Sequence, residues 1–354
     1  MNWRYFVAGA TLSAGVSLSV GPASAQEPSK QDLKMVGTWN FTTHYKEIEQ
    51  PFFTKAITEA SGGKVKIDIK SITELGLSGF EVVDLTRKGV YDIVAGVIAY
   101  VASKSPELEA VDLAGVMPEF NEMKKSTEVY RDVVAREFEQ KYGVHLVGMF
   151  SYPSQQFWCN KPINTLDDLK GLRTRVYGSS LGDFMKGIGG VPVTIAFGEV
   201  VPALQKGVAD CGITGTLPAY DAKWREVVTH IYKAGLGWGP SFIAMNKRKW
   251  DSLDKPTQAF LTKQFADFEA KAWAGVKEND EQGFICNTGK GGKCRFGEPG
   301  SMTVVEPSAE DKKKMKDVVE KFVLSSWAKR CGDACVKKWN DTIGKVVGMK
   351  AKAE

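Results

Sequence analysis

The sequence predicts an α/β protein of two domains in which parallel strands are joined by helices. A chain of 354 residues has room for about two domains of roughly 150 residues each. Apolar residues make up 43% and charged residues 25% of it, as in an ordinary globular protein. Between Asp168 and Tyr220, apolar runs, helical patterns and glycines follow in the order strand, helix, strand, helix, strand. Parallel strands require such helical crossovers, which is why this segment predicts an α/β layout.

The first 25 residues have the composition of a secretion signal. Arg4 is basic, 6–20 is apolar, and the small residues 23–25 form a cleavage pattern. The apolar run is shorter than the about 20 residues of a membrane-spanning helix, and an uncleaved anchor is the alternative. We expect cleavage after Ala25 and a mature chain in the periplasm.

Strands and helices alternate in the first part of the chain. The segment 64–70 alternates apolar and polar residues, as a half-buried strand does. Glycines at 62 and 63 precede it and end a helix. Up to residue 152 the pattern predicts strands at 33–39, 64–70, 91–97 and 144–150, and helices at 52–60, 80–88 and 122–142.

The same alternation continues in the second part. Gly189, Gly190 and Gly207 follow helical runs, where glycine commonly ends a helix. Pro256 suits the first turn of a long helix. The pattern predicts strands at 157–163, 172–176, 194–197, around Cys211 and at 242–246, and helices at 181–188, 199–206, 256–282 and through most of 309–345.

The segment 168–220 resembles the signature of the periplasmic solute-binding proteins of TRAP transporters. The matching pieces are Lys-Gly-Leu-Arg-Thr-Arg-Val at 170–176, Phe-Gly-Glu-Val at 197–200 and Ala-Leu-Gln-Lys-Gly at 203–207, followed by Asp210. Asn-Lys-Pro-Ile at 160–163 fits the turn that precedes them. The resemblance extends from about residue 33 to 282 and does not include the C-terminal part with its cysteines.

The resemblance implies the periplasmic-binding-protein fold. In this fold two α/β lobes are joined by a hinge, a ligand cleft lies between them, and a long helix spans both. The first lobe would comprise 26–152 and 241–280, and the second 153–240 and 281–354. Such a receptor closes on its solute and delivers it to the membrane subunits of a TRAP permease.

Arg175 is the residue that the resemblance assigns to the ligand's carboxylate. A guanidinium presents a rigid fork of N–H donors that matches a carboxylate bidentately. Thr214 stands four residues after Asp210, where many family members have an asparagine that helps to hold the carboxylate. A hydroxyl can still donate there, but the difference indicates another ligand shape.

Gln155, or its neighbour Gln156, stands where family members that bind sialic acid carry a further arginine. A neutral amide there argues against a multiply charged ligand. Glu74, on a loop after a strand, is a further polar candidate. Aromatic residues are expected to form the cleft wall, and the candidates are Trp39, Tyr100, Tyr152, Phe157, Tyr177, Phe197 and Trp238.

Six cysteines in an exported chain favour disulfides. Cys286 and Cys294 bracket a loop rich in glycine and lysine, and Cys331 and Cys335 flank three residues, so elimination pairs Cys159 with Cys211. Spacing alone leaves fifteen pairings formally open. Zinc is the alternative, but Cys-x-x-x-Cys without a nearby histidine fits it poorly. We expect no metal and no cofactor.

The sequence is compatible with three functions. The sequence predicts a receptor for a small 2-oxo or 2-hydroxy monocarboxylate, with an aromatic carboxylate as the next choice. An exported enzyme is less favoured, because the sequence has no Gly-x-Ser-x-Gly, His-Glu-x-x-His or phosphate-loop motif. A sensory input domain would use the same pocket without transport. The net charge of +5 and the lysines near the C-terminus fit a solvated surface, not a nucleic-acid site.

Overall fold

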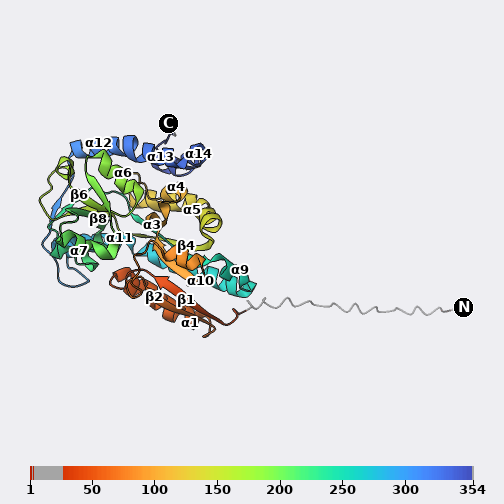
Figure 1. The fold of residues 1–354 in the computed structure, drawn as a ribbon. Helices are drawn as coiled ribbons and strands as arrows, with labels where there is room; N and C mark the ends of the chain where they lie inside the picture. Colours follow the sequence, from red (N-terminus) through yellow and green to blue (C-terminus); the bar gives the residue numbers. More distant parts are fainter. Residues whose placement is uncertain (2, 4–26, 353–354) are drawn as a thin grey trace.

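The computed structural model describes residues 1, 3 and 27–352. Apart from these first two single residues, the predicted secretion signal lies outside the described residues. Two sheets organise the described part, and helices pack around both (Figure 1). This arrangement confirms the predicted α/β class.

The first sheet has the strand order β2-β1-β3-β10-β4. Strand β1 pairs in parallel with β2 and β3, and β10 runs antiparallel between β3 and β4. All residues of β3 are buried, as expected for a central strand covered on both faces. The strands are β1 (Gln31–Gly37), β2 (Val65–Ser71), β3 (Ile93–Val97), β4 (Val144–Tyr152) and β10 (Gly239–Asn246).

The second sheet has the strand order β11-β9-β5-β8-β6-β7. Strand β6 runs parallel to β7 and β8, whereas β5 runs antiparallel to β8 and β9. The strands are β5 (Gln155–Cys159), β6 (Arg173–Val176), β7 (Val191–Thr194), β8 (Cys211–Gly215), β9 (His230–Tyr232) and β11 (Thr303–Val305).

The predicted strand at 194–197 is wrong by three residues. Strand β7 covers Val191–Thr194, and Phe197–Glu199 forms a 3-10 turn instead. Strand β7 lies at the edge of the sheet, where Pro192, which has no N–H, is tolerated. The run is apolar on both sides of Thr194, so its pattern could not place the strand's end.

The predicted helix at 256–282 is two helices in the structure. Helix α10 (Lys255–Ala274) ends at Gly275 and α11 (Val276–Thr288) begins directly after it. Glycine is a poor residue for a helix interior, which makes it a natural place for a break. Near the other end of the chain, residues 43–60 form one continuous helix that includes two π-helical stretches on either side of Pro51.

The remaining helices cover the two sheets and connect them. They are α1 (Ile57–Ala60), α2 (Val82–Arg87), α3 (Ile98–Ala102), α4 (Pro106–Glu109), α5 (Phe120–Tyr142), α6 (Ser179–Gly187), α7 (Val200–Gln205), α8 (Thr216–Asp221), α9 (Lys247–Ser252), α12 (Ala309–Val318), α13 (Ser325–Cys331), α14 (Asp333–Asp341) and α15 (Ile343–Val347).

We call the part built on the first sheet the first lobe and the part built on the second sheet the second lobe. The C-terminal helices cross from one to the other along the top of Figure 1. The π-helical turn after α12 packs on α6, α13 packs on α4 and α15 packs on α5, while α14 packs on α13 and α15. Arg330 joins both lobes, because its guanidinium lies 3.0 Å from Glu109 and 2.7 Å from Asp183. The predicted lobe boundaries stay a proposal, since the C-terminal residues contact both lobes.

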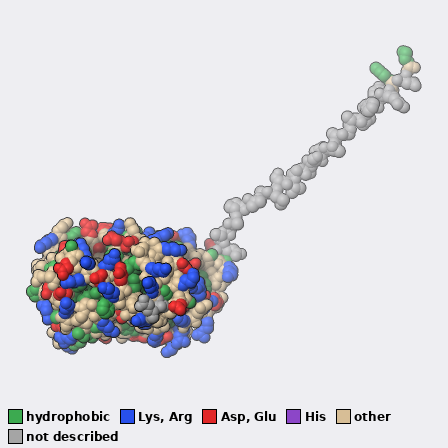
Figure 2. Space-filling model, turned by 90° about the horizontal axis from the view of Figure 1, so that it is seen from above, with side chains coloured by type: hydrophobic (Ala, Val, Ile, Leu, Met, Phe, Trp, Pro, Cys, Tyr) green, Lys and Arg blue, Asp and Glu red, His purple; other side chains and the backbone are tan. Residues whose placement is uncertain are grey.

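The six cysteines form three disulfides, which are Cys159–Cys211, Cys286–Cys294 and Cys331–Cys335. The face shown in Figure 2 carries basic and acidic side chains interspersed over the surface, in line with solvated lysines. Among the described residues, no helix combines the length and apolar character needed to cross a membrane.

Candidate ligand-binding site

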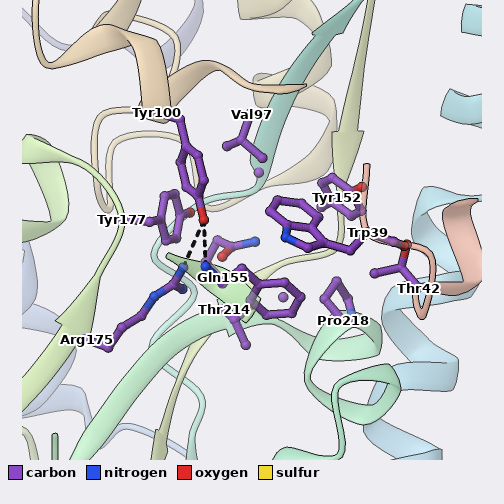
Figure 3. A pocket seen from close by; sticks show the side chains of 13 residues that line it. Trp39, Thr42, Val97, Tyr100, Tyr152, Gln155, Arg175, Tyr177, Thr214 and Pro218 are labelled. Atoms are coloured by element: carbon purple, nitrogen blue, oxygen red, sulfur yellow. Dashed lines mark hydrogen bonds between the residues drawn. The ribbon is translucent and has the colours of Figure 1, made fainter. Parts of the chain in front are cut away.

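A small cavity of about 40 Å³ lies between the two lobes (Figure 3). Such a volume holds a few water molecules, or part of a small ligand. Eight of the eleven site residues predicted from the sequence line it, Gln155 and its neighbour being counted as one. The lining residues are Trp39, Thr42, Val97, Tyr100, Tyr152, Gln155, Arg175, Tyr177, Phe197, Thr214, Gly215, Pro218 and Gly239.

The topology brings these residues together at the carboxyl ends of strands. Trp39 follows β1 and Val97 ends β3 in the first lobe. Tyr177 follows β6 and Thr214 lies near the end of β8 in the second lobe. Ligands of open α/β sheets bind outside the carboxyl ends of parallel strands, so the location is the one that this layout favours.

Arg175 lies in β6, is 1% exposed and extends its guanidinium to the cavity (Figure 3). Its Nε donates to the carbonyl of Ile195 at 2.9 Å and its Nη1 to the carbonyl of Ile213 at 2.7 Å. Its Nη2 lies 3.4 Å from the hydroxyl of Tyr100. A guanidinium has five N–H groups, so two are left for another acceptor.

The charge of Arg175 has no anionic partner among the described residues. No carboxylate oxygen of the described residues lies within 4.0 Å of a guanidinium nitrogen of Arg175, whereas Arg131, Arg173 and Arg330 each have such a partner. Burial lowers its pKa, but an arginine starts so high that it stays protonated. A buried charge without a counter-ion is costly, and an anionic ligand would offset that cost.

Two tyrosines flank the guanidinium as neutral groups. Burial raises the pKa of Tyr100 and raises that of Tyr177 well above its ordinary value. The Tyr100 hydroxyl accepts a hydrogen bond from the backbone N–H of Phe197 at 2.9 Å. Arg175 lies over the ring of Tyr177 at 5.0 Å, close enough for a cation–π contact. The tyrosines therefore position the arginine without neutralising it.

An aromatic wall closes the opposite side of the cavity. Trp39 packs edge-on against Phe197 with ring centroids 5.1 Å apart, and against Tyr152 at 6.4 Å. Gln155 contributes an amide whose nitrogen donates to the carbonyl of Pro153. Thr214 is 5% exposed, and its hydroxyl has no hydrogen bond within the described residues. The cavity thus combines one cation, a few neutral polar groups and aromatic rings.

Three predicted site residues lie elsewhere. Phe157 is fully buried inside the second lobe, between the rings of Phe184 and Tyr232. The indole of Trp238 donates to the carbonyl of Pro118 at 3.0 Å, away from the cavity. Glu74 accepts hydrogen bonds from the backbone and the hydroxyl of Ser71, the last residue of β2, and these bonds lower its pKa.

Sequence reasoning did not assign five lining residues to the site, namely Thr42, Val97, Gly215, Pro218 and Gly239. Thr42 directly precedes the helix 43–60, and its hydroxyl donates to the carbonyl of Trp39 at 2.8 Å. The two glycines are closely surrounded, since a Cβ would lie 3.0 Å from its nearest neighbour at Gly215 and 3.1 Å at Gly239. Their position directly beside strand ends was the one available signal.

The described residues contain no group of three or more histidine, cysteine, aspartate or glutamate side chains arranged to hold a metal ion. None of the cavity's lining residues is acidic. Arg175 is the one charged side chain among the residues that line this cavity.

Comparison with known proteins places these features in a family. The model of the DctP family, described as bacterial extracellular solute-binding protein family 7, matches residues 36–330. The C4-dicarboxylate-binding periplasmic protein DctP of Rhodobacter capsulatus is 25% identical over 177 residues, which is 50% of this chain and 53% of that protein. The alignment thus spans about half of that relative.

Solved structures share the fold over almost the whole described chain. An extracytoplasmic solute receptor of Bordetella pertussis that binds pyroglutamic acid has a TM-score of 0.80 at 22% identity, covering 89% of this chain and 100% of that one. A TRAP solute-binding protein of Sulfitobacter with bound β-D-galacturonate has a TM-score of 0.76 at 17% identity, covering 90% and 100%. The chain belongs to the DctP family of TRAP transporter solute-binding proteins, the extracytoplasmic receptors of these transporters.

Proposed function

We propose that this receptor binds a small organic monocarboxylate, of the 2-oxo or 2-hydroxy acid class, through a bidentate pair with Arg175. The observation that carries the proposal is the buried guanidinium with two N–H groups to spare and no carboxylate beside it among the described residues. A carboxylate can accept from two donors, and Nη1 and Nη2 of Arg175 each keep one N–H for it.

One charge in the pocket favours one charge on the ligand. Arg175 is the one cationic residue that lines the described cavity. A second carboxylate would be buried against aromatic rings, with no cation to offset its desolvation. Dicarboxylates are therefore expected to bind poorly, although the Rhodobacter capsulatus relative is named for them.

Neutral hydroxyl groups in the cavity would bind the 2-oxo or 2-hydroxy oxygen of the proposed ligand. The hydroxyl of Thr214 and the hydroxyl of Tyr177 line the same cavity as the guanidinium. They would serve an oxygen on the carbon next to the carboxylate, since hydroxyls both donate and accept. An aromatic carboxylate is the alternative ligand, because rings such as Trp39 line the cavity. The small volume of the cavity favours a smaller acid.

The test is a thermal-shift screen of the purified mature chain against organic acids. The set would contain pyruvate, lactate, benzoate, succinate, pyroglutamate and galacturonate, the last two because the compared structures hold them. We expect small monocarboxylates to raise the melting temperature, since a ligand stabilises the form that it binds. A shift with succinate alone, or with the larger sugar acid galacturonate alone, would refute the proposal.

We also propose that the chain is exported with cleavage after Ala25, acts without chemical turnover and delivers its acid to a TRAP permease. The support is the N-terminal composition together with membership of a family of solute receptors. Uptake of labelled acid by permease-containing vesicles should require this protein. A sensory domain would bind the acid but leave uptake unchanged, and an enzyme would release a product in place of the acid that was added.

A further inference from the structure

A contact across the cleft lies directly beside the ligand cavity. Trp39 and Thr42, from the segment before the helix 43–60, line the cavity on the first-lobe side. Pro218, in α8, lines it on the second-lobe side. The next residue after Thr42 and the last residue of α8 meet at the cavity's edge.

These two residues are Thr43 and Asp221. The backbone N–H of Thr43 donates to Oδ2 of Asp221 at 2.7 Å, and its hydroxyl donates to Oδ1 at 2.9 Å. Thr43 is the first residue of the helix 43–60, where backbone N–H groups have no partner within the helix. A carboxylate at that position satisfies such a donor and interacts favourably with the helix dipole. The cap of a first-lobe helix is thus supplied by the second lobe.

We propose that Asp221 is a positioning residue that fastens the closed form of the receptor, and that closure over a ligand loads a proton onto it. This inference rests on the proposed function, because it takes the cavity to be the ligand site. Opening the lobes would break both hydrogen bonds and return the carboxyl group to water. Closing them would fix Thr42, next to Thr43, against the ligand.

The surroundings of Asp221 determine the direction of the proton coupling. Burial between the lobes raises its pKa to about 6, while the two Thr43 donors and Lys46 act against this rise and Glu47 adds to it. In an open form the carboxyl group faces water, where an aspartate has a pKa of about 3.9. Because the closed form has the higher pKa, closure takes up protons, and affinity rises as the pH falls through about 6.

His44 and Tyr152 line the same space as Asp221, and Tyr152 stays neutral because burial raises its pKa well above its ordinary value. His44, next to Thr43, lies 3.5 Å from the buried carboxylate of Glu49. Arg225 donates to the carbonyl of Tyr220. Asp280 of α11 accepts from Ser154 and from the threonine that begins α8. Burial also raises the pKa of Asp280, so this residue could contribute to a pH dependence of affinity. A variant at Asp221 is therefore needed to separate the two contributions.

The test measures the affinity for pyruvate by calorimetry at pH 5.0 and pH 7.5, in the wild type and in Asp221→Asn. Asparagine keeps the shape and one acceptor but does not titrate. From the two pKa values, the wild type should bind about tenfold more tightly at pH 5.0. Asp221→Asn should bind equally at both values. Glu226→Gln, an exposed carboxylate of the same lobe, is the matched control and should keep the wild-type profile.

A wild-type profile without slope, or an Asp221→Asn variant that keeps the slope, would overturn the inference. If pyruvate does not bind, the proposed function is in question, and spin labels then test the fastening alone. Labels on Lys70→Cys and Lys206→Cys, one exposed site in each lobe, report the distance between the lobes. In ligand-free protein the short distance should gain population at pH 5.0 with Asp221 and not with asparagine. No gain would overturn the inference independently of any ligand.

Discussion

The most direct prediction concerns the guanidinium of Arg175. Replacement by glutamine keeps a hydrogen-bond donor but removes the charge and the fork. Three of the five N–H groups are directed to two carbonyls and a tyrosine hydroxyl, which leaves two for the ligand. Removing one partner of a buried, hydrogen-bonded charge pair costs about 2–5 kcal/mol. We therefore expect Arg175→Gln to weaken binding by at least about 30-fold, since about 1.4 kcal/mol is a factor of ten.

Isothermal titration with the acid found by the screen measures this loss, and the same strand provides its control. Arg173 lies two residues earlier in β6 and is exposed, and its side chain pairs with Asp210 at 3.1 Å outside the cavity. Arg173→Gln should bind as the wild type does. Arg175→Lys, which keeps the charge without the fork, should still lose most of the affinity. Unchanged affinity in Arg175→Gln, or an equal loss in Arg173→Gln, would refute the assignment.

Three further changes test the hydroxyl in the cavity, a disulfide and a close helix contact. Thr214→Val removes one hydroxyl at constant shape and should weaken binding about fivefold by titration, near 1 kcal/mol. Replacing Cys159 and Cys211 by alanine opens a loop with a sequence separation of 52 and should lower the free energy of unfolding by about 4 kcal/mol in urea. Gly283→Ala places a Cβ against the backbone of Leu217 and should cost about 1–3 kcal/mol by the same measurement.

Matched variants decide these cases. Thr214→Ser keeps the hydroxyl and should restore binding. Gly182→Ala, whose Cβ would meet nothing closer than 3.9 Å, should not destabilise the protein as Gly283→Ala does. If Thr214→Ser bound as weakly as Thr214→Val, the hydroxyl would have no role in binding. If Gly283→Ala were as stable as Gly182→Ala, the close contact at Gly283 would be contradicted. If the variant with alanine at both Cys159 and Cys211 kept the wild-type free energy of unfolding, the disulfide would not stabilise the fold.

The sequence predicted the class of the fold because local patterns determine it. Alternation in β2 and the buried run of β3 are visible in a single segment. Element ends were less certain, as the shift at β7 and the break at Gly275 show. An apolar run does not record where pairing with a neighbouring strand stops, and a helix pattern continues across one glycine.

The site could be predicted only as far as its chemistry is local. Arg175 and Thr214 follow from motifs that lie on strands. Trp238 has the same type of ring as Trp39, yet its indole is bonded to a carbonyl 120 residues away and lies outside the cavity. Nothing in the sequence distinguishes the two rings, because the difference depends on which loop each one meets. Asp221 was not singled out for the same reason, since its partner lies 178 residues away.

Both sides of the cavity carry hydrogen bonds between the lobes, and this has a consequence for selectivity. On one side, Tyr100 of the first lobe contacts Arg175 and accepts from the backbone of Phe197 in the second lobe. On the other side, Thr43 and Asp221 meet. A ligand too large for the cavity would keep both sets apart, so it would lose these hydrogen bonds in addition to its own fit. The receptor would therefore reject large ligands for two reasons, because they fit the cavity poorly and because they prevent the hydrogen bonds between the lobes from forming.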